Sequence, residues 1–413
     1  MSSAAEFHWD EMIPLDDLVV SGNVKLGRGN VISKIDIRNN PGPFPIYSSS
    51  SKNEGKMGEY GEYMFDEEMI SWSVDGGGYF FYRPKHKFSV TNVSGYMRLS
   101  ADWDYRFTAY SLQFQHEYFS FDYQTKAHPS VIREFYLFPK VPIFEQQKIA
   151  KILTSVDKVI EKTRAQIDKL KDLKTGMMQE LLTNGIGHTN FKPIPKWTTG
   201  KIPDLQTMPA SWELVNLTSV AKLESGHTPS RDNSAYWDGA IPWLSLHDTK
   251  NLANPILSKT VYSVTQEGID NSSARVLPTG TVAFSRTASV GNCVILGKEM
   301  ATSQDFANYI CGDRINNRFL LQLFRWMQHV WSALSEGSTH KTIYMPVFKK
   351  LQILLPPIDE QITIAEMADR IDQNIKAKGD KLQSLIDIKK ALMQDLLTGK
   401  VRVKVEEKEP VVA

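Results

Sequence analysis

The sequence predicts an α+β chain with two homologous globular domains of mixed strands and short helices, separated by two long antiparallel coiled-coil helices. Residues 142–183 and 357–398 superpose without a gap at an offset of about 215 positions, and roughly 16 of about 42 positions are identical, as in an internal repeat. Both copies have helical apolar spacing, and each follows a stretch rich in strands and turns. The chain is therefore expected to be a tandem duplication with pseudo-twofold symmetry.

The apolar residues of both copies recur at steps of three and four, which is typical of a seam between paired helices. At about 1.5 Å per residue each helix would be roughly 60 Å long. We expect a spacer between the domains; the alternative is a helical hairpin used only for dimerisation. Thr163 and Lys378, near the midpoints, would form a polar layer that penalises slipped registers. The expected seam comprises Ile149, Ile152, Val156, Val159, Ile167, Leu170, Leu173, Met177 and Leu181, and Ile364, Met367, Ile371, Ile375, Leu382, Leu385, Ile388, Leu392 and Leu396.

Composition changes along the chain predict six segments. The first domain has the composition of short strands and turns: 44–51 is an apolar run that ends in small hydroxyl residues, and two strands are expected on either side of a glycine turn within 69–84. Residues 107–115 have helical apolar spacing. An alternating VRVKV at 401–405 is consistent with an added edge strand. The segments are a first domain at 1–141, a first helix at 142–184, a linker rich in Gly and Pro at 185–211, a second domain at 212–355, a second helix at 356–399 and a tail at 400–413.

Composition also restricts the class of protein. Cys293 and Cys311 are the only cysteines among 413 residues, which excludes a disulfide framework and a CxxC-type metal site and predicts two buried thiols. No apolar run suits a membrane span and the N-terminus resembles no signal peptide, so we expect a cytoplasmic protein without membrane contact. A net charge of +1 predicts that any binding to nucleic acid relies on local basic residues or on partners.

The two domains are related to each other. Arg106-Phe107 matches Arg318-Phe319, Thr91-Asn92 matches Ser303-Gln304, and His128 matches His340, all at an offset of about 212 positions. Offsets between other matches drift, as insertions in loops would cause. We expect two copies of one fold whose surface loops have diverged.

Several strings resemble the specificity subunits of Type I restriction–modification enzymes. LLPPIDEQITIAEMADRID (354–372) and KKALMQDLLTGKVRV (389–403) are similar to that family's second repeated helix, and VPIFEQQKIAKILTSVD (141–157) to its first. GHTPSRDNSAYWDGAIPWLSLHD (226–248) resembles the family's G-x-TPS…YW-x-G-x-IPW signature, which the first domain lacks before Pro45.

The resemblance implies a non-catalytic subunit with two target-recognition domains, each of which reads one half of a split double-stranded DNA sequence. It also implies that the helices fix the half-site spacing and dock two methylation subunits, and that motor-nuclease subunits join in the restriction complex. No catalytic or metal-binding residue is expected, and S-adenosylmethionine, ATP and Mg²⁺ are expected only on the partner subunits.

Reading DNA needs donors and acceptors at base edges and basic groups on phosphates. The alternative is structural: Gly226, Thr228 and Pro229 would build a turn, and Ser303-Gln304-Asp305 would cap a helix. Arg106 of the first domain and Arg318 of the second occupy equivalent positions, which favours a structural or phosphate-binding role. The candidate contacts are Ser50, Lys52, Arg83, Lys85, Asn92, Lys126 and His128 in the first domain, and His227, Thr228, Ser230, Arg231, Ser285, Arg286, Gln304, His340 and Lys341 in the second.

The sequence leaves two alternative functions open. For a DNA-modifying enzyme, residues 40–44 (NPGPF) are only superficially similar to the Asn-Pro-Pro-aromatic motif of amino-methyltransferases, and no glycine-rich cofactor loop, GxxxxGK[ST] or HExxH string occurs. Binding of S-adenosylmethionine by the isolated chain would favour this function. A coiled-coil interaction scaffold without a DNA role is the other, and stable homodimers formed through the helices would favour it.

Overall fold

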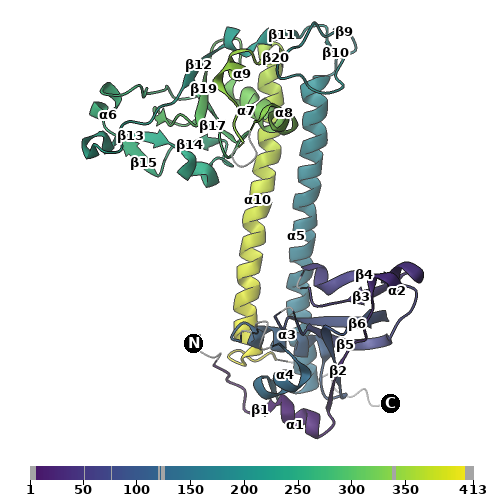
Figure 1. The fold of residues 1–413 in the computed structure, drawn as a ribbon. Coiled ribbons are helices and arrows are strands. Elements are labelled where there is room, and N and C mark those ends of the chain that lie inside the picture. Colours follow the sequence, from purple (N-terminus) through teal and green to yellow (C-terminus); the bar gives the residue numbers. More distant parts are fainter. Residues whose placement is uncertain are drawn as a thin grey trace. The chain divides into compact units, whose positions relative to one another are not determined.

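The computed structural model describes residues 6–50, 52–75, 77–119, 121, 126–336 and 341–404. The chain divides into two compact units, Met1–Ala165 with Asp380–Ala413, and Gln166–Gly379. Each unit thus joins one globular domain to the start of one long helix and the end of the other (Figure 1). None of the helices in the described chain combines the length and hydropathy that a membrane span requires.

A six-stranded sheet in the order β2-β7-β5-β6-β3-β4 forms the centre of the first unit. Its strands pair antiparallel, except that β3 runs parallel to β6. The strands expected within 69–84 are confirmed as β5 and β6, and the helix expected at 107–115 as α3. The elements are β1 (Met12–Pro14), α1 (Leu15–Val20), β2 (Val24–Arg28), α2 (Lys34–Asn39), β3 (Phe44–Tyr47), η1 (Lys52–Gly55), β4 (Lys56–Tyr60), β5 (Phe65–Ser73), β6 (Phe80–Val90), β7 (Ser94–Leu99), α3 (Tyr105–His116), α4 (Pro129–Phe135) and β8 (Leu137–Pro139).

The second unit repeats this topology. Its sheet β12-β19-β16-β17-β14 begins with the order of β2-β7-β5-β6, and the parallel pair β13–β18 repeats β3–β6. The expectation of two copies of one fold is therefore confirmed. The elements are β11 (Glu213–Asn216), η2 (Leu217–Ser219), β12 (Ala221–Ser225), η3 (Ser234–Tyr236), β13 (Trp237–Leu244), η4 (Leu246–Asn251), β14 (Ile256–Leu257), β15 (Tyr262–Val264), α6 (Gln266–Asp270), β16 (Val282–Ser285), β17 (Cys293–Leu296), β18 (Ala301–Thr302), β19 (Phe306–Cys311), α7 (Asn317–Trp326), α8 (Gln328–Leu334), α9 (Met345–Lys349) and β20 (Gln352–Leu355).

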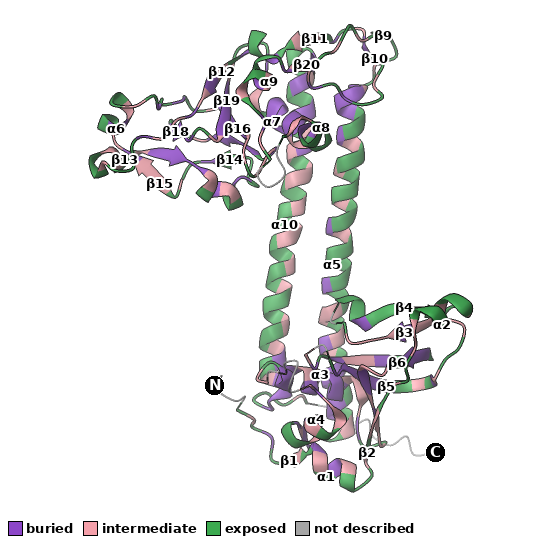
Figure 2. Cartoon of the chain, in the orientation of Figure 1, coloured by how far each residue is buried: buried purple, intermediate pink, exposed green. Residues whose placement is uncertain are grey.

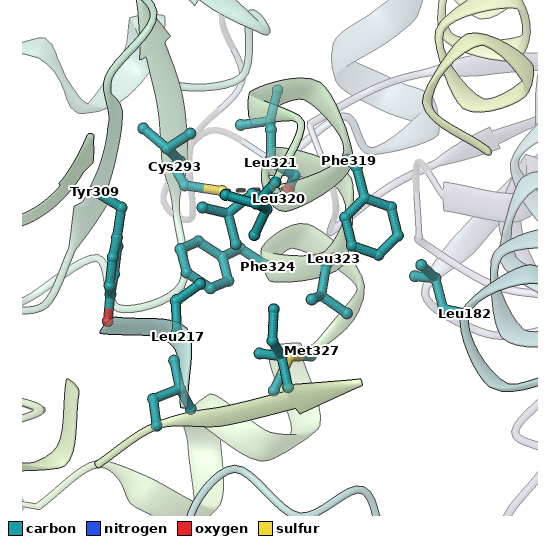
Figure 3. Packing of buried hydrophobic residues seen from close by; sticks show 14 of the residues in the cluster. Leu182, Leu217, Cys293, Tyr309, Phe319, Leu320, Leu321, Leu323, Phe324 and Met327 are labelled. Carbon is teal, nitrogen blue, oxygen red and sulfur yellow. Dashed lines mark hydrogen bonds between the residues drawn. The ribbon is translucent and has the colours of Figure 1, made fainter. Parts of the chain in front are cut away.

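One hydrophobic core joins the second domain to the long helices. Figure 3 shows Phe319, Leu323 and Phe324 of α7 in this core, which also contains Leu182 from the first long helix and Ile364 from the second. Cys293 is buried there as predicted, whereas Cys311 is only partly buried. Since apolar burial contributes about 25 cal/mol per Å², a shared core attaches the domain firmly to both helix ends (Figure 2).

The long helices α5 (Ile143–Thr183) and α10 (Ile358–Leu397) run antiparallel within each unit. In the first unit Lys389 Nζ lies 2.7 Å from Asp157 Oδ1. In the second, Lys174 Nζ lies 2.6 Å from Asp372 Oδ2. These two ion pairs occupy equivalent positions in the repeat, and the predicted antiparallel pairing is confirmed.

The seam differs in part from the expected one. Val159, Leu173 and Ile388 were placed in it wrongly, because they are 42%, 58% and 50% exposed. One run of buried and half-buried positions in α5 alternates steps of four and three, and this run includes the polar residues Thr163 and Lys174. The other expected seam residues are buried or half-buried: Ile149, Ile152, Val156, Ile167, Leu170, Met177, Leu181, Ile364, Met367, Ile371, Ile375, Leu382, Leu385, Leu392 and Leu396.

Outside the domains, the linker contains local structure that its composition does not predict, and the expected tail strand needs correction. The segment 185–211 contains an antiparallel pair, β9 (Phe191–Pro193) with β10 (Thr207–Pro209), besides irregular chain. Residues 401–404 form no strand in the described part of the tail. Instead, Arg402 Nη2 lies 2.7 Å from Glu145 Oε2, and Val403 N donates to Glu145 Oε1 at 3.1 Å, so the tail is fixed as a cap on the start of α5.

Candidate nucleic-acid interface

The same β-turn follows the parallel-paired strand in each unit. In the first unit it spans residues 91–94, with a hydrogen bond of 3.0 Å from Ser94 N to Thr91 O. In the second it spans residues 303–306, with a bond of 3.2 Å from Phe306 N to Ser303 O. The second residue is Asn92 in one turn and Gln304 in the other. The predicted helix cap at 303–305 is therefore wrong, because this segment turns directly into β19.

A glycine loop packs against each turn. Gly29 N donates to Ser94 O at 3.2 Å, and its counterpart Gly226 donates to Phe306 O at 3.4 Å. A Cβ at Gly29 would lie 1.8 Å from Val90 O, and one at Gly226 would lie 2.1 Å from Ser303 O. Only glycine permits this approach, which brings the residues after β2 and β12 beside the turn.

In the second unit four candidate residues meet around the turn. The Thr228 hydroxyl donates to Gln304 Oε1, and Arg286 Nε donates to Gln304 O at 2.8 Å. Arg286 Nη1 also reaches Ile343 O at 3.4 Å, and Ala288 N donates to Lys341 O at 3.1 Å. The predicted residues Thr228, Arg286, Gln304 and Lys341 therefore belong to one set of adjoining loops, beside His227, whose amide donates to Thr302 O at 2.9 Å.

Arg231 is exposed on an aromatic cluster at the start of β13. Its guanidinium carbon lies 5.3 Å from the ring centre of Trp237 and 5.8 Å from those of Trp243 and Tyr262. Trp237 Nε1 donates to the carbonyl of Ser230 at 2.9 Å. Such cation–π contacts orient a guanidinium without using its N–H donors, which remain available for a ligand.

The first unit places Lys126 beside its turn, whereas Ser50 and Lys52 lie between β3 and β4 and Lys85 lies within β6. Lys126 Nζ lies 3.1 Å from Asp75 Oδ1, and Asp75 N donates to the carbonyl of Val93 in the turn. Lys52 N donates to Ser50 Oγ at 3.1 Å, and Lys85 is exposed on β6. Arg28 Nη2 donates to the carbonyl of Asn92. Arg28 was not predicted, although its place at the end of a strand, before a glycine, was a usable signal.

Two of the predicted contact residues lie inside the protein and need correction. Arg83 is 2% exposed; Nε donates to Ser71 Oγ at 2.9 Å and Nη2 to Glu54 O at 2.5 Å. Burial lowers the pKa of this guanidinium to about 10. Ser285 is fully buried, and its hydroxyl lies 2.8 Å from Ser289 Oγ. Neither side chain reaches the surface, because loops cover both of them. The positions of these loops cannot be predicted from sequence patterns.

The other two predicted histidines are His128 and His340. His128 is the N-cap of α4, where its side chain accepts from Ser130 N, as a structural residue does. His340 lies outside the described residues. The shared arginines contact the long helices: Arg106 Nη1 lies 3.2 Å from Thr154 Oγ1 and Arg318 Nη1 lies 3.2 Å from Asp369 Oδ2, which supports their structural interpretation.

Comparison with known proteins identifies the family. The model of the Type I restriction modification DNA specificity domain matches residues 11–172 and 209–386. Three specificity subunits of Methanocaldococcus jannaschii are similar: MjaIX (28% identity over 44% of this chain), the putative MjaX subunit (28% over 64%) and MjaVIII (26% over 81%). The matched segments span 43%, 59% and 79% of those relatives, respectively.

Solved structures agree in fold. The S subunit of a Type I restriction–modification system from M. genitalium superposes with a TM-score of 0.59 at 14% identity, covering 96% of this chain and 98% of that one. A chain from a study of the assembly of a type I R-M system gives 0.56 at 14% identity, covering 95% and 98%. Because the domain model matches most of the sequence, and both units contain the repeated domain, the protein belongs to the family of Type I restriction–modification specificity subunits.

Proposed function

We propose that this chain reads a bipartite double-stranded DNA target, each domain reading one half. The observation that carries the proposal is the repeated turn, which keeps its backbone in both units while the residues around it differ. In the first unit Asn92 lies in the turn and Lys126 lies beside it; in the second, Gln304 lies in the turn and is bonded by Thr228 and Arg286. A common backbone with different donors and acceptors suits two domains that read different bases.

We further propose that α5 and α10 fix the distance between the half-sites. Two features support this role. Each domain shares a core with the helix ends of its own unit, in the first through Phe107, Ile149 and Leu396. The heptad seam also disfavours bending or slipping of the paired helices.

The helices would also dock two methylation subunits. Several residues are identical in both copies and exposed in both, so helix pairing does not account for them. They are Pro142 and Pro357, Asp172 and Asp387, and Gln179 and Gln394. Two copies of one partner require two equivalent surfaces, and these residues are the candidate contacts.

In this proposal the chain contributes recognition and no catalysis. S-adenosylmethionine, ATP and Mg²⁺ would be bound by the methylation and motor-nuclease subunits, and the complex would act on DNA in the cytoplasm. Within the described residues, no group of three or more His, Cys, Asp or Glu side chains is arranged to hold a metal ion.

Exchanging the first domain tests the proposal. We expect replacement of residues 1–141 by the corresponding domain of a relative to change one half of the methylated sequence and leave the other half and the spacing unchanged. The measurement is the pattern of methylated bases in cells that carry the complete system. The reciprocal exchange of residues 212–355 is the matched control and should change only the other half. A change in both halves after either exchange would contradict the modular assignment.

A further inference from the structure

We propose that Asn92 and Gln304 are equivalent base-reading residues, each of which recognises an A·T base pair in the half-site of its own domain. The inference rests on the proposed function and adds the residues that determine specificity. An amide side chain can donate to N7 and accept from the N6 amino group of adenine in the major groove, a pairing specific to that base.

Position is the first argument. Both residues are the second residue of the repeated turn; Gln304 is exposed and Asn92 is half-exposed. A β-turn favours Asn, Asp or Ser because their side chains bond to the nearby backbone. Turn conformation alone could therefore explain Asn92, but it gives no reason for the longer Gln304. Two amide side chains at equivalent exposed positions have in common their hydrogen-bonding groups.

The support beneath each amide is the second argument. Arg28 donates to the carbonyl of Asn92, and Arg286 donates to that of Gln304. These arginines are not equivalent: Arg28 ends β2, whereas Arg286 follows β16.

The first-unit counterpart of Arg286 is Val74. Val74 N donates to Val93 O at 3.0 Å, and Arg286 N donates to Asp305 O at 2.9 Å in the same arrangement. The equivalent carbonyls of Asn92 and Gln304 thus accept from arginines at the ends of different strands, β2 in the first unit and β16 in the second. A guanidinium used in this way positions the turn, and we assign Arg28 and Arg286 as positioning residues.

Thr228 is the third argument. Its hydroxyl donates to Gln304 Oε1, which fixes the amide and leaves both Nε2 hydrogens and one Oε1 lone pair for a base. The counterpart of Thr228 in the first unit is Val31, which has no hydrogen-bonding side chain and is 75% exposed. Because a fixed amide loses less conformational entropy on binding, we expect Gln304 to discriminate more strongly than Asn92.

Gln304→Glu and Asn92→Asp test the assignment in the assembled complex with its methylation subunits. A carboxylate of similar shape accepts from cytosine N4 but cannot donate to adenine N7. Each variant should lower the preference for A·T at one position of one half-site about 10- to 100-fold, with a shift toward C·G. The measurement is the set of sequences modified from a randomised DNA library. Gln266→Glu, at an exposed glutamine of α6, is the matched control and should leave the target unchanged.

Arg28→Met and Arg286→Met, which remove the charge at similar side-chain length, separate positioning from phosphate contact. A phosphate contact would reduce the slope of log affinity against log salt by about one when it is removed. We expect the slope to remain as in the wild type, while the preference at the base position read by the adjacent amide falls.

The outcomes are distinguishable. If Gln304→Glu or Gln304→Ala weakens all sequences equally, or changes positions in both halves, the inference is overturned. A split target that stays the same in both amide variants also overturns it but leaves the proposed function intact. A wild-type complex that modifies no split sequence would instead refute the proposed function.

Discussion

Replacing Gln361 by leucine should lower the free energy of unfolding by about 2–4 kcal/mol. Gln361 is fully buried at the start of α10. Its Oε1 accepts from Asn316 N at 2.9 Å, and its Nε2 donates to Arg314 O at 3.0 Å and Pro356 O at 2.8 Å. Leucine has a similar volume, so packing is largely kept while three backbone groups lose their partner.

The repeat supplies a matched variant. Gln146 makes the same bonds in the first unit: its Oε1 accepts from Asp104 N at 2.8 Å and its Nε2 donates to Asp102 O and Val141 O at 3.1 and 2.7 Å. Gln146→Leu should therefore cost a similar amount in chemical denaturation. Gln179→Leu, at an exposed site on α5, should change stability by about 0.5 kcal/mol or less. An equally small loss for Gln361→Leu would contradict this account.

Gln361 shows which structural features can be predicted from the sequence and which cannot. The repeated Pro-Ile-x-Glu-Gln string was visible and marked the start of both helices. Its role was not visible, because the partners at Arg314 and Asn316 lie far along the chain and come close only through the packing of α7 against α10. Repeats and local spacing predicted the helices, the duplication and the antiparallel pairing, all of which depend on periodicity.

The candidate site was predicted in part for the same reason. The match of Thr91-Asn92 with Ser303-Gln304 correctly marked equivalent positions in the two domains, because both copies kept the same local hydrogen bonds, but it did not predict that these positions form turns. Arg83 was misassigned because its burial depends on the loop before β4. Val159 was misassigned because steps of three and four are equally plausible from sequence, and only the partner helix selects between them.

The lysines in the seam permit a second strong prediction. Within each unit one lysine bonds an aspartate of the opposite helix: Lys174 with Asp372, and Lys389 with Asp157. Parallel pairing of the two copies in register would instead place Lys174 against Lys389. In the second unit, a slip of seven residues would leave Lys174 opposite Gly379 or Ala365. Only the observed register pairs the charges, which is how polar seam residues specify one arrangement.

We therefore expect Lys174→Asp combined with Lys389→Asp to lower the free energy of unfolding by about 2–4 kcal/mol per unit, because each change puts two carboxylates together in a half-buried seam. Lys169→Asp with Lys390→Asp, at exposed positions on the same helices, is the control and should have little effect.

Adding Asp157→Lys and Asp372→Lys reverses both pairs and should restore most of the stability, measured by chemical denaturation at low salt. Restoration will be incomplete, because Tyr110 donates to Asp157 Oδ2 at 2.5 Å and Gln322 to Asp372 Oδ2 at 3.3 Å. In the second unit Ile186 N donates to Glu360 Oε1 at 2.9 Å, as the tail bonds Glu145 in the first. If the fourfold variant is no more stable than the twofold one, complementary charge does not set the register, and the apolar heptads together with these contacts at Glu145 and Glu360 must do so alone.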